Sequence, residues 1–326
     1  MNPLAPFLET FGFVMLDGGI STELERHGAD LDDPLWTSRV LLDAPERIRA
    51  MHRAFLASGA DVIATTSYQA SVAGFRHAGL DEDAARRTMR DAVAVAVAER
   101  DAFWSIPANR SGRLRPLVAV SLGPYGACLH DGSEYHGNYA ADSATVREFH
   151  RERIALLADT PADLFAFETI PSLAEAETLL ELLPGFPGLR AWLSFSCRDG
   201  EHVAHGERFG DCARRVAVSP QVLAVGVNCT APEHVTDLLA AAAGAGRPLV
   251  AYPNSGEQWD ADAQCWRGSA CDAMDVGAWY ALGARLLGGC CRTAADDIAR
   301  MRRDLQKAVA GRLESPRGKA QDRVVE

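Results

Sequence analysis

Three cysteines stand where their thiols could meet around one metal ion. Cys290 and Cys291 adjoin after the apolar run 284–289, and Cys229 directly follows the run 222–228. Three thiolates about 2.3 Å from a common centre are a ligand set for zinc. The spacing matches no zinc-finger pattern, so the thiols converge only if the fold brings the two runs together. A buried cysteine pair with a separate core cysteine is the alternative.

A zinc site built from three sulfurs favours one kind of chemistry. Thiolates donate much electron density, so the metal would be a weak Lewis acid, whereas sites that activate water usually use histidine and carboxylate ligands. A sulfur-rich site suits a substrate thiol instead, because the metal lowers the pKa of the thiol while the sulfur stays nucleophilic. These ligands therefore predict alkylation of a thiol.

Eight short apolar runs, alternating with longer helical patterns, must position these residues. Nearly continuous apolar content is typical of parallel strands buried on both faces. The alternation implies crossover helices, and eight repeats favour a closed (β/α)8 TIM barrel over an open doubly wound sheet. The predicted strands are 13–17, 61–67, 116–122, 163–168, 190–196, 222–228, 248–254 and 284–289.

Helices are predicted in the intervals between the strands. Gly59 is a typical residue to end the first of them. Ser172 with Glu175, and Thr293 with Asp296, have the spacing of an N-terminal capping box. No linker divides the chain, so residues 1–310 are predicted to form one barrel domain and the polar segment 311–326 a flexible tail. The predicted helices are 44–59, 82–100, 144–158, 173–183, 207–217, 232–243, 272–282 and 293–307.

Composition excludes several classes of protein. The 326 residues carry 33 Lys+Arg against 44 Asp+Glu, a net charge of −11, which argues against nucleic acid or an anionic membrane as partner. No apolar run approaches the ~18 residues of a membrane span, and the N-terminus lacks the basic region of a secretory signal. We therefore expect a cytoplasmic protein, in which the eight cysteines are thiols or metal ligands rather than disulfides. Packing or surface roles are expected for the other five, which are Cys128, Cys197, Cys212, Cys265 and Cys271.

Several longer segments resemble one family of enzymes. The segments, in chain order, are LDGGISTELERHG, DDPLWTSRVLLDAPE, GADVIATTSYQAS, SLGPYGACLHDGSEYHGNY, FETIPSLAEAE, VGVNCTAPEHV, VAYPNSGEQWD and GARLLGGCC. Together they resemble the homocysteine S-methyltransferases over nearly the whole chain. The resemblance implies a (β/α)8 barrel, a Zn²⁺ ion, homocysteine as acceptor and methionine as product. The SLGPYGA segment is closer to the branch that uses S-methylmethionine or S-adenosylmethionine as donor.

The resemblance also implies roles for single residues. It makes Cys229, Cys290 and Cys291 the zinc ligands, and it gives Asp17 and Glu168 to the amino group of homocysteine, which two carboxylates suit electrostatically. A carboxylate that caps a helix or pairs with an arginine is the alternative for either acid. Further expected contacts are Gly18 and Gly19 at the substrate carboxylate, Asn228 beside the metal, and Trp36, Thr65 and Tyr68 along the pocket. For the glycines and Asn228 the alternative is an ordinary turn, and for Trp36 a place in the core.

The long loop after the third predicted strand, from Gly123 to about Ala141, is typical of a lid. Its side chains Tyr125, Asp131 and Glu134 suit a sulfonium donor by charge and cation–π attraction, and a solvated loop is the alternative. Cys128, His130 and His136 in the same loop depart from the usual family pattern.

The mechanism expected from these residues is direct methyl transfer, with the homocysteine sulfur as the fourth zinc ligand. A zinc hydrolase or a redox protein with a Cys290–Cys291 disulfide on the same barrel is the alternative, and a barrel that only stores zinc is a further one. The usual His-x-His of such hydrolases is missing after the first strand, where Asp17-Gly18-Gly19 stands. A monomer or small homo-oligomer is expected.

Overall fold

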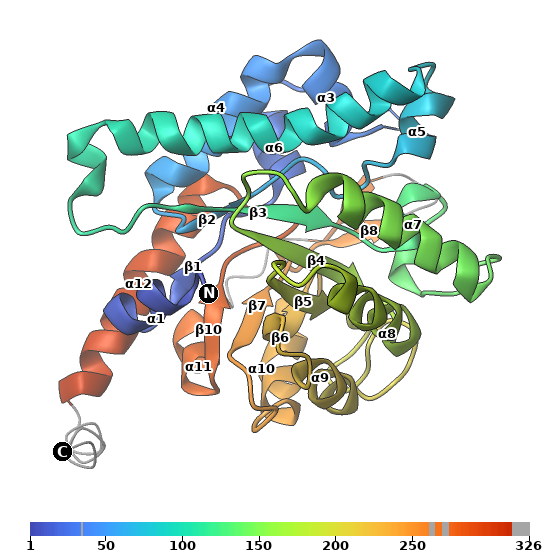
Figure 1. The fold of residues 1–326 in the computed structure, drawn as a ribbon. Helices are drawn as coiled ribbons and strands as arrows, with labels where there is room; N and C mark the ends of the chain where they lie inside the picture. Colours follow the sequence, from blue (N-terminus) through green and yellow to red (C-terminus); the bar gives the residue numbers. More distant parts are fainter. Residues whose placement is uncertain (34, 261–264, 269–273, 315–326) are drawn as a thin grey trace.

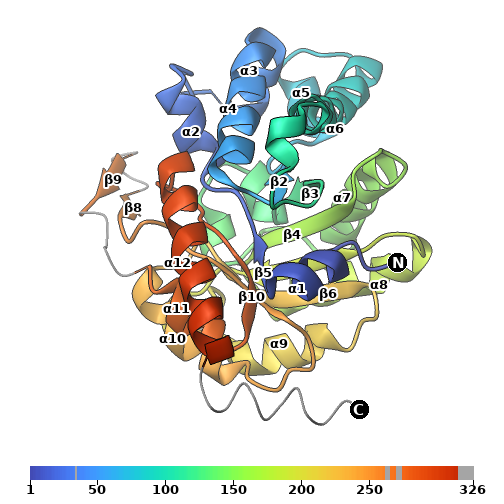
Figure 2. The ribbon, with the colours of Figure 1, turned by 90° about the vertical axis from the view of Figure 1, so that its left-hand side faces the viewer.

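The computed structural model describes residues 1–33, 35–260, 265–268 and 274–314. Eight parallel strands form a nearly closed barrel with helices outside it, in the order β1-β10-β7-β6-β5-β4-β3-β2 (Figures 1 and 2). The predicted (β/α)8 barrel is confirmed. Its strands are β1 (Val14–Met15), β2 (Val62–Ala64), β3 (Leu117–Leu122), β4 (Leu164–Ile170), β5 (Ala191–Phe195), β6 (Val222–Asn228), β7 (Leu249–Tyr252) and β10 (Ala284–Leu287).

Helices follow the strands as the alternation predicted, and each predicted helix overlaps an observed one, although α6, α7 and α12 extend beyond the predicted ranges. The α-helices are α1 (Ala5–Phe11), α2 (Ile20–Arg26), α3 (Thr37–Asp43), α4 (Pro45–Ser58), α5 (Val72–His77), α6 (Glu82–Ser105), α7 (Ser143–Leu157), α8 (Leu173–Leu182), α9 (Phe209–Ala217), α10 (Pro232–Ala241), α11 (Val276–Ala281) and α12 (Ala295–Glu314). Short 3₁₀ helices cover η1 (Pro107–Arg110), η2 (Tyr125–Cys128), η3 (Ser133–Tyr135) and η4 (Leu183–Gly185). An antiparallel hairpin, β8 (Gln258–Asp260) with β9 (Cys265–Arg267), was not predicted and lies at the periphery (Figure 2).

Two of the three predicted helix ends are confirmed. The Ser172 hydroxyl accepts from the Glu175 amide at 3.2 Å, and Gly59 ends α4 with a φ of 106°. The Thr293 capping box is wrong, because the Thr293 hydroxyl donates to the Cys290 carbonyl at 2.6 Å. Helix α12 continues through Glu314, so residues 311–314 of the predicted tail are helical, and 315–326 lie outside the described residues.

The inside of the barrel is filled by alternate strand residues. Val14 and Leu16 from the first strand face Leu117 and Ala119 from the third in one buried apolar cluster. Such alternation is the packing expected of a small barrel, whose interior is solid rather than a pore. Leu4 and Phe7 from the N-terminal segment join the same cluster, so α1 closes one mouth of the barrel. The functional site is therefore left to the opposite, C-terminal mouth.

Aspartate side chains close the seam between β1 and β2, which the sheet ladder leaves open. The Asp61 amide donates to the Met15 carbonyl at 2.7 Å, and the Asp61 carboxylate accepts from the Met15 amide at 2.9 Å. Two residues after Met15 in the chain, the Asp17 carboxylate accepts from the Ala64 amide at 2.7 Å. Two carboxylates thus replace backbone partners along the seam.

A buried arginine neutralises the lower of these carboxylates. Arg302 of α12 donates to the Asp61 carboxylate at 2.9 Å and to the Gly59 carbonyl at 2.6 Å. Its guanidinium also lies 5.6 Å from the ring centroid of Phe11 and 5.7 Å from that of Phe13. Since Asp61 is fully buried, its charge depends on this partner. The last helix is therefore fixed to the first two strands by one ion pair.

None of the helices in the described ranges is long and apolar enough to cross a bilayer.

We predict that Arg302→Ala lowers the free energy of unfolding by about 3 kcal/mol, because it leaves the buried Asp61 carboxylate without its cation. Urea unfolding followed by circular dichroism measures the change. Arg303→Ala, at the exposed neighbouring position, is the matched control and should shift the midpoint little. Equal stability of the two variants would contradict the role given to the ion pair.

Candidate metal and substrate site

The three predicted ligand cysteines meet at the C-terminal mouth of the barrel. The Sγ atoms of Cys229, Cys290 and Cys291 all lie within 4.8 Å of one another, and those of Cys229 and Cys291 are 3.8 Å apart. Three sulfurs held tetrahedrally at 2.3 Å from one ion would be about 3.8 Å apart. The cluster therefore fits a metal ion with little rearrangement. It is the one group of three or more such ligands found among the described residues.

The thiols of the cluster share their protons. Hydrogen bonds from Cys229 and Cys290 hold the pKa of Cys291 well below its usual range, whereas the pKa values of Cys229 and Cys290 are raised. A cation would complete the set by displacing the remaining protons, since the thiolate is the form that binds metal.

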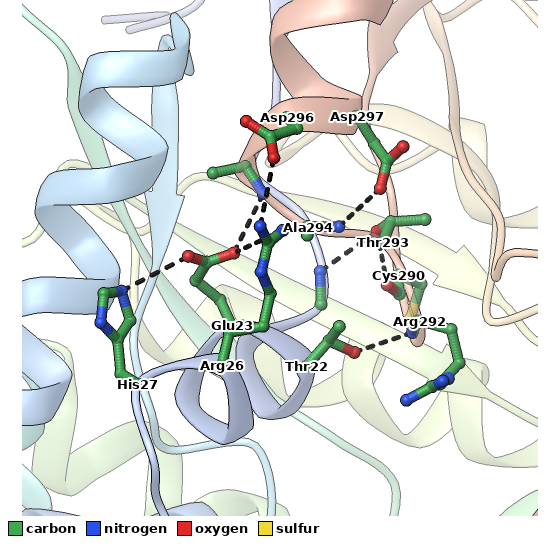
Figure 3. Close-up of polar contacts among 12 residues, drawn as sticks. Thr22, Glu23, Arg26, His27, Cys290, Arg292, Thr293, Ala294, Asp296 and Asp297 are labelled. Carbon is green, nitrogen blue, oxygen red and sulfur yellow. Dashed lines mark hydrogen bonds and ion pairs between the residues drawn. The ribbon is translucent and has the colours of Figure 1, made fainter.

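Residues 290–293, which we term the ligand turn, are held from the first strand and α2. The Gly19 amide donates to the carbonyl of Thr293 at 2.9 Å, and Arg292 donates through its amide to the Thr22 hydroxyl at 2.9 Å (Figure 3). A Cβ on Gly19 would lie 2.6 Å from the Cys290 carbonyl oxygen. The Gly19 amide is therefore engaged with Thr293, and this glycine positions the ligand turn.

Further contacts fix α2 against the start of α12. The Glu23 carboxylate accepts from the Ala295 amide at 3.1 Å, and Arg26 donates to Asp296 at 3.1 Å (Figure 3). A Cβ on Gly289 would lie 2.1 Å from the Thr293 hydroxyl oxygen, so only glycine lets the chain pass here. Gly19 precedes α2 and Gly289 precedes Cys290, and both positions need glycine because neighbouring atoms leave no space for a Cβ.

Backbone strain gathers around the cluster. Left-handed φ angles occur at Cys229 (47°), Thr169 (60°) and Arg292 (64°), none of which is a glycine. Such conformations cost on the order of 1 kcal/mol or more and persist only where the surroundings impose them. Here they turn the chain sharply at strand ends, and at Cys229 the turn brings a thiol in from a strand two places away from β10.

Asn228 is the buried link between the cluster and three strands. Its Oδ1 accepts from the Thr169 amide at 2.7 Å and from the Ser194 hydroxyl at 2.8 Å. Its Nδ2 donates to the Thr169 hydroxyl at 2.8 Å and points to the Cys290 sulfur at 3.8 Å. The side chain is thus more than a turn former, because it fixes β4 and β5 relative to one ligand.

Glu168, at the end of β4, is held in one orientation. One carboxylate oxygen accepts from the Ser121 hydroxyl and the other from the Tyr252 hydroxyl at 3.0 Å. Burial raises its pKa to about 7, and the nearby Cys290 charge adds to the rise. The tyrosine is itself fixed by the indole of Trp192 at 2.9 Å. No arginine or lysine pairs with this carboxylate among the described residues, which removes the ion-pair alternative.

Asp17 forms the second acid of the site. Burial raises its pKa to about 8, and the negative charges of Glu168 and Cys290 contribute to the rise. The charge of Cys290 therefore acts on both acids, and the charge of Glu168 acts on Asp17. Neither carboxyl group forms an ion pair with an arginine or lysine among the described residues.

The expected pocket residues lie beside these acids in different roles. Trp36 is half-buried and its ring meets that of Tyr68 edge-on at 6.2 Å, so it is not a core residue. Thr65 is fully buried, and its hydroxyl contacts the Ser67 hydroxyl at 2.6 Å and accepts from the Ser121 amide at 3.1 Å. Thr65 therefore supports the serine that orients Glu168.

Several residues of the site escaped the sequence analysis. Ser121 and Tyr252 hold Glu168, and Thr293 holds the ligand turn. Tyr135 is a fourth: the residue as a whole is exposed, and the pKa of its hydroxyl is raised by desolvation and by the charges of Cys229 and Cys291. Serine and tyrosine at the ends of predicted strands were the only available signal, and it is shared by many structural residues.

Cys128, Cys197, Cys212 and the two loop histidines are not part of the cluster. Cys197 and Cys212 are buried, and the Cys128 thiol donates to the Gln69 carbonyl at 3.0 Å. His130 and His136 are exposed, as expected for single loop histidines. Cys271 lies outside the described residues, and Cys265 falls in β9.

Comparisons with known proteins agree with this site. The sequence model of the Homocysteine S-methyltransferase family matches residues 14–305. The homocysteine S-methyltransferase YbgG of Bacillus subtilis is 45% identical over 303 residues, which cover 91% of this chain and 96% of the relative. The metallated form of the homocysteine methyltransferase MmuM from Escherichia coli superposes with a TM-score of 0.82 at 42% identity, covering 93% of this chain and 99% of the other. The chain therefore belongs to the homocysteine S-methyltransferase family.

Proposed function

We propose that this protein transfers a methyl group from a sulfonium donor to the thiolate of homocysteine, giving methionine. The observation that carries the proposal is the pairing of three convergent sulfurs with two buried carboxyl groups at one barrel mouth. Sulfurs suit an acceptor thiol, and carboxylates suit the ammonium group of an amino acid. The chain belongs to the homocysteine S-methyltransferase family, whose name specifies the same acceptor, homocysteine.

The three cysteines are proposed to hold Zn²⁺. The sulfur-only donor set favours a soft or borderline ion, and the spacing of 3.8 Å between Cys229 and Cys291 suits zinc. When bound, the ion lowers the pKa of the acceptor thiol and leaves its sulfur nucleophilic. A solved structure of the Escherichia coli relative is of its metallated form, which supports metal binding by this protein.

Asp17 and Glu168 are proposed to bind the amino group of homocysteine. Glu168 is oriented by Ser121 and Tyr252, so only small movements are needed to place an oxygen on an ammonium group. Of the two glycines assigned to the substrate carboxylate, Gly19 already uses its amide on Thr293. Binding of the carboxylate is therefore proposed for Gly18 alone.

The methyl transfer itself needs no proton donor. A lone pair of the homocysteine thiolate forms the new carbon–sulfur bond, and the electrons of the broken bond stay on the donor sulfur, which leaves as a neutral thioether. One negative and one positive reactant thus become two neutral products. Because charge is lost in the transition state, a water-poor site favours the reaction, and the protein's contribution is positioning and desolvation.

S-methylmethionine is proposed as the donor, with S-adenosylmethionine as the second candidate. Every side chain assigned above belongs to one copy of the chain, so a monomer would suffice, and a small homo-oligomer would be compatible. A reducing compartment such as the cytoplasm would keep the three thiols available for metal.

The rival reactions are less well supported by the site. A hydrolase would be expected to use histidine or carboxylate ligands, and the group of three holds cysteines alone. A redox protein would use Cys290 and Cys291 as a disulfide, yet all three sulfurs converge, and a third thiol has no part in a vicinal disulfide. Thiol titration separates the redox disulfide from a metal site.

We predict that Cys290→Ser weakens metal binding at least about 100-fold and abolishes methionine formation, because it removes one of three ligands. Metal content by atomic emission and an assay with homocysteine and S-methylmethionine measure the two effects. Cys212→Ala, which alters a buried cysteine outside the cluster, is the control and should keep both. Full activity of a metal-free Cys290→Ser protein would refute the assignment.

Thiol titration of the native protein should show three additional reactive thiols when a chelator is added. A redox disulfide would instead require a reductant and would release two. The experiment needs no substrate, so it tests the metal site independently of the reaction.

We predict that an amino acid without a thiol binds more tightly as the pH rises. The pKa values of Asp17 and Glu168 are raised to about 8 and about 7, so both groups lose charge as the pH falls through these values and gain it as the pH rises. Norleucine affinity should increase about tenfold between pH 6 and pH 8. Calorimetry on the metal-loaded protein measures it, and norleucine avoids the titration of the acceptor thiol.

Asp17→Asn is the matched variant for this experiment. The amide oxygen of asparagine still accepts from the Ala64 amide, so the seam is kept while the charge is lost. The pH dependence should flatten in the variant. An unchanged slope would show that Asp17 does not face the ammonium group.

A further inference from the structure

The loop between β3 and α7, residues 123–142, contains three side chains that suit a cationic donor, and the structure separates their roles. Tyr125 packs edge-on against the rings of Tyr139 at 5.4 Å and Phe149 at 5.2 Å. Asp131 is exposed, and its carboxylate accepts from the Ser133 amide at 3.0 Å. These two side chains shape the loop.

Glu134, the third, is buried without a full set of partners. The residue is 9% exposed, and its Oε2 is buried with no hydrogen-bond partner in the described part of the chain. A buried carboxylate oxygen without a donor is destabilising, because it has lost its water and gained nothing in exchange. Such an orphan atom indicates a ligand that completes it.

The surroundings of Glu134 place it beside the thiol cluster. Burial raises the pKa of the Tyr68 hydroxyl, and the charges of Glu134 and Cys229 add to the rise. Burial likewise raises the pKa of Tyr135, and the charges of Cys229, Cys291 and Glu134 add to it. The two tyrosine hydroxyls therefore lie within electrostatic reach of both the carboxylate and the sulfurs.

Buried contacts hold the loop so that Glu134 keeps this position. The Glu175 carboxylate accepts from the Tyr125 amide and from the Tyr139 hydroxyl, both at 2.6 Å, and contacts His150 at 2.8 Å. A Cβ on Gly126 would lie 2.5 Å from the Glu134 amide nitrogen, so the two 3₁₀ turns of the loop pack backbone to backbone. The carboxylate is thus preorganised.

A buried arginine fixes the tyrosine side of the same space. Arg153 of α7 donates to the carbonyl of Tyr68 at 2.6 Å, to that of Ser67 at 3.0 Å and to that of Gly123 at 2.8 Å. The guanidinium therefore holds together the backbone carbonyl groups that follow β2 and β3. No arginine or lysine pairs with Glu134 among the described residues.

We propose that Glu134 binds the positively charged group of the methyl donor, which makes it a specificity-determining residue for a sulfonium amino acid. The assignment rests on the proposed methyl transfer and adds a residue for the second substrate, whereas Asp17 and Glu168 serve the first. A donor of this class carries one net positive charge, and Glu134 supplies the opposite charge near the attacking sulfur.

Burial suits this carboxylate to a cation in particular. It raises the pKa of Glu134 to about 7, and the Asp131 charge adds to the rise, so that much of the group is protonated in the empty protein. A cation that enters stabilises the ionised form, whereas a neutral thioether does not. The product of the donor is such a thioether, and its release is therefore favoured once the methyl group has left.

The decisive experiment is steady-state kinetics of Glu134→Gln with S-methylmethionine and homocysteine. The KM of the donor should rise at least about tenfold, while the KM of homocysteine and the bound metal stay as in the parent protein. Glu134→Asp, which keeps the charge, should recover part of the loss. Glu148→Gln, at an exposed position on α7, is the matched control and should leave both KM values unchanged.

Two outcomes would overturn the inference. One is a donor KM of Glu134→Gln within twofold of the parent value. The other is an equal rise of both KM values in Glu134→Gln and Glu134→Asp, which would show a structural role for the side chain.

Direct binding separates this inference from the proposed function. If the metal-loaded parent forms no methionine with either donor, the proposed reaction fails, and calorimetry with S-methylmethionine then decides the case of Glu134. Weaker binding by Glu134→Gln than by the parent would support the carboxylate as a cation site. Equal binding by the two proteins, or none by the parent, would reject it.

Discussion

Convergence of three sulfurs from two separate strand ends is the constraint on which the rest of the structure depends. Strand β7 lies between β6 and β10, so the chain must bend inward after both outer strands before the thiols can meet. The left-handed residues Cys229 and Arg292 make these bends. The hydrogen bonds of Thr293 and Asn228 hold these bends in place. The contacts that offset the backbone strain form only when the strands have assembled into the barrel.

The second organising feature is a set of hydroxyl groups that fixes Glu168, one of the two acids. Thr65 contacts the Ser121 amide, Ser121 holds Glu168, and Tyr252 holds the same carboxylate from the other side. Each member comes from a different strand, so the barrel register sets their spacing. These neutral partners fix the orientation of Glu168 without cancelling its charge, as the proposed binding of an amino group requires.

Sequence patterns predicted the architecture because each strand is buried on both faces and is therefore nearly continuous in apolar residues. The ligand cysteines could be found for the same reason, since they directly follow such runs. Thr293 was misassigned because its hydroxyl serves the ligand turn instead of a helix end, which depends on contacts with Gly19. Tyr135 was missed because a tyrosine in a loop gives no sign in the sequence that sulfurs from distant segments lie near it. Pairings between distant segments leave no local pattern.

The double duty of Asp17 has a consequence for engineering. One carboxylate closes the β1–β2 seam through the Ala64 amide and is also the group proposed to bind the amino group of the acceptor. A variant meant to take a methyl-accepting substrate without an amino group would still need a side chain that accepts a hydrogen bond at this position. An aliphatic residue would leave the Ala64 amide without a hydrogen-bond partner. Altered selectivity and an intact cylinder are thus compatible only through isosteric polar replacements at residue 17.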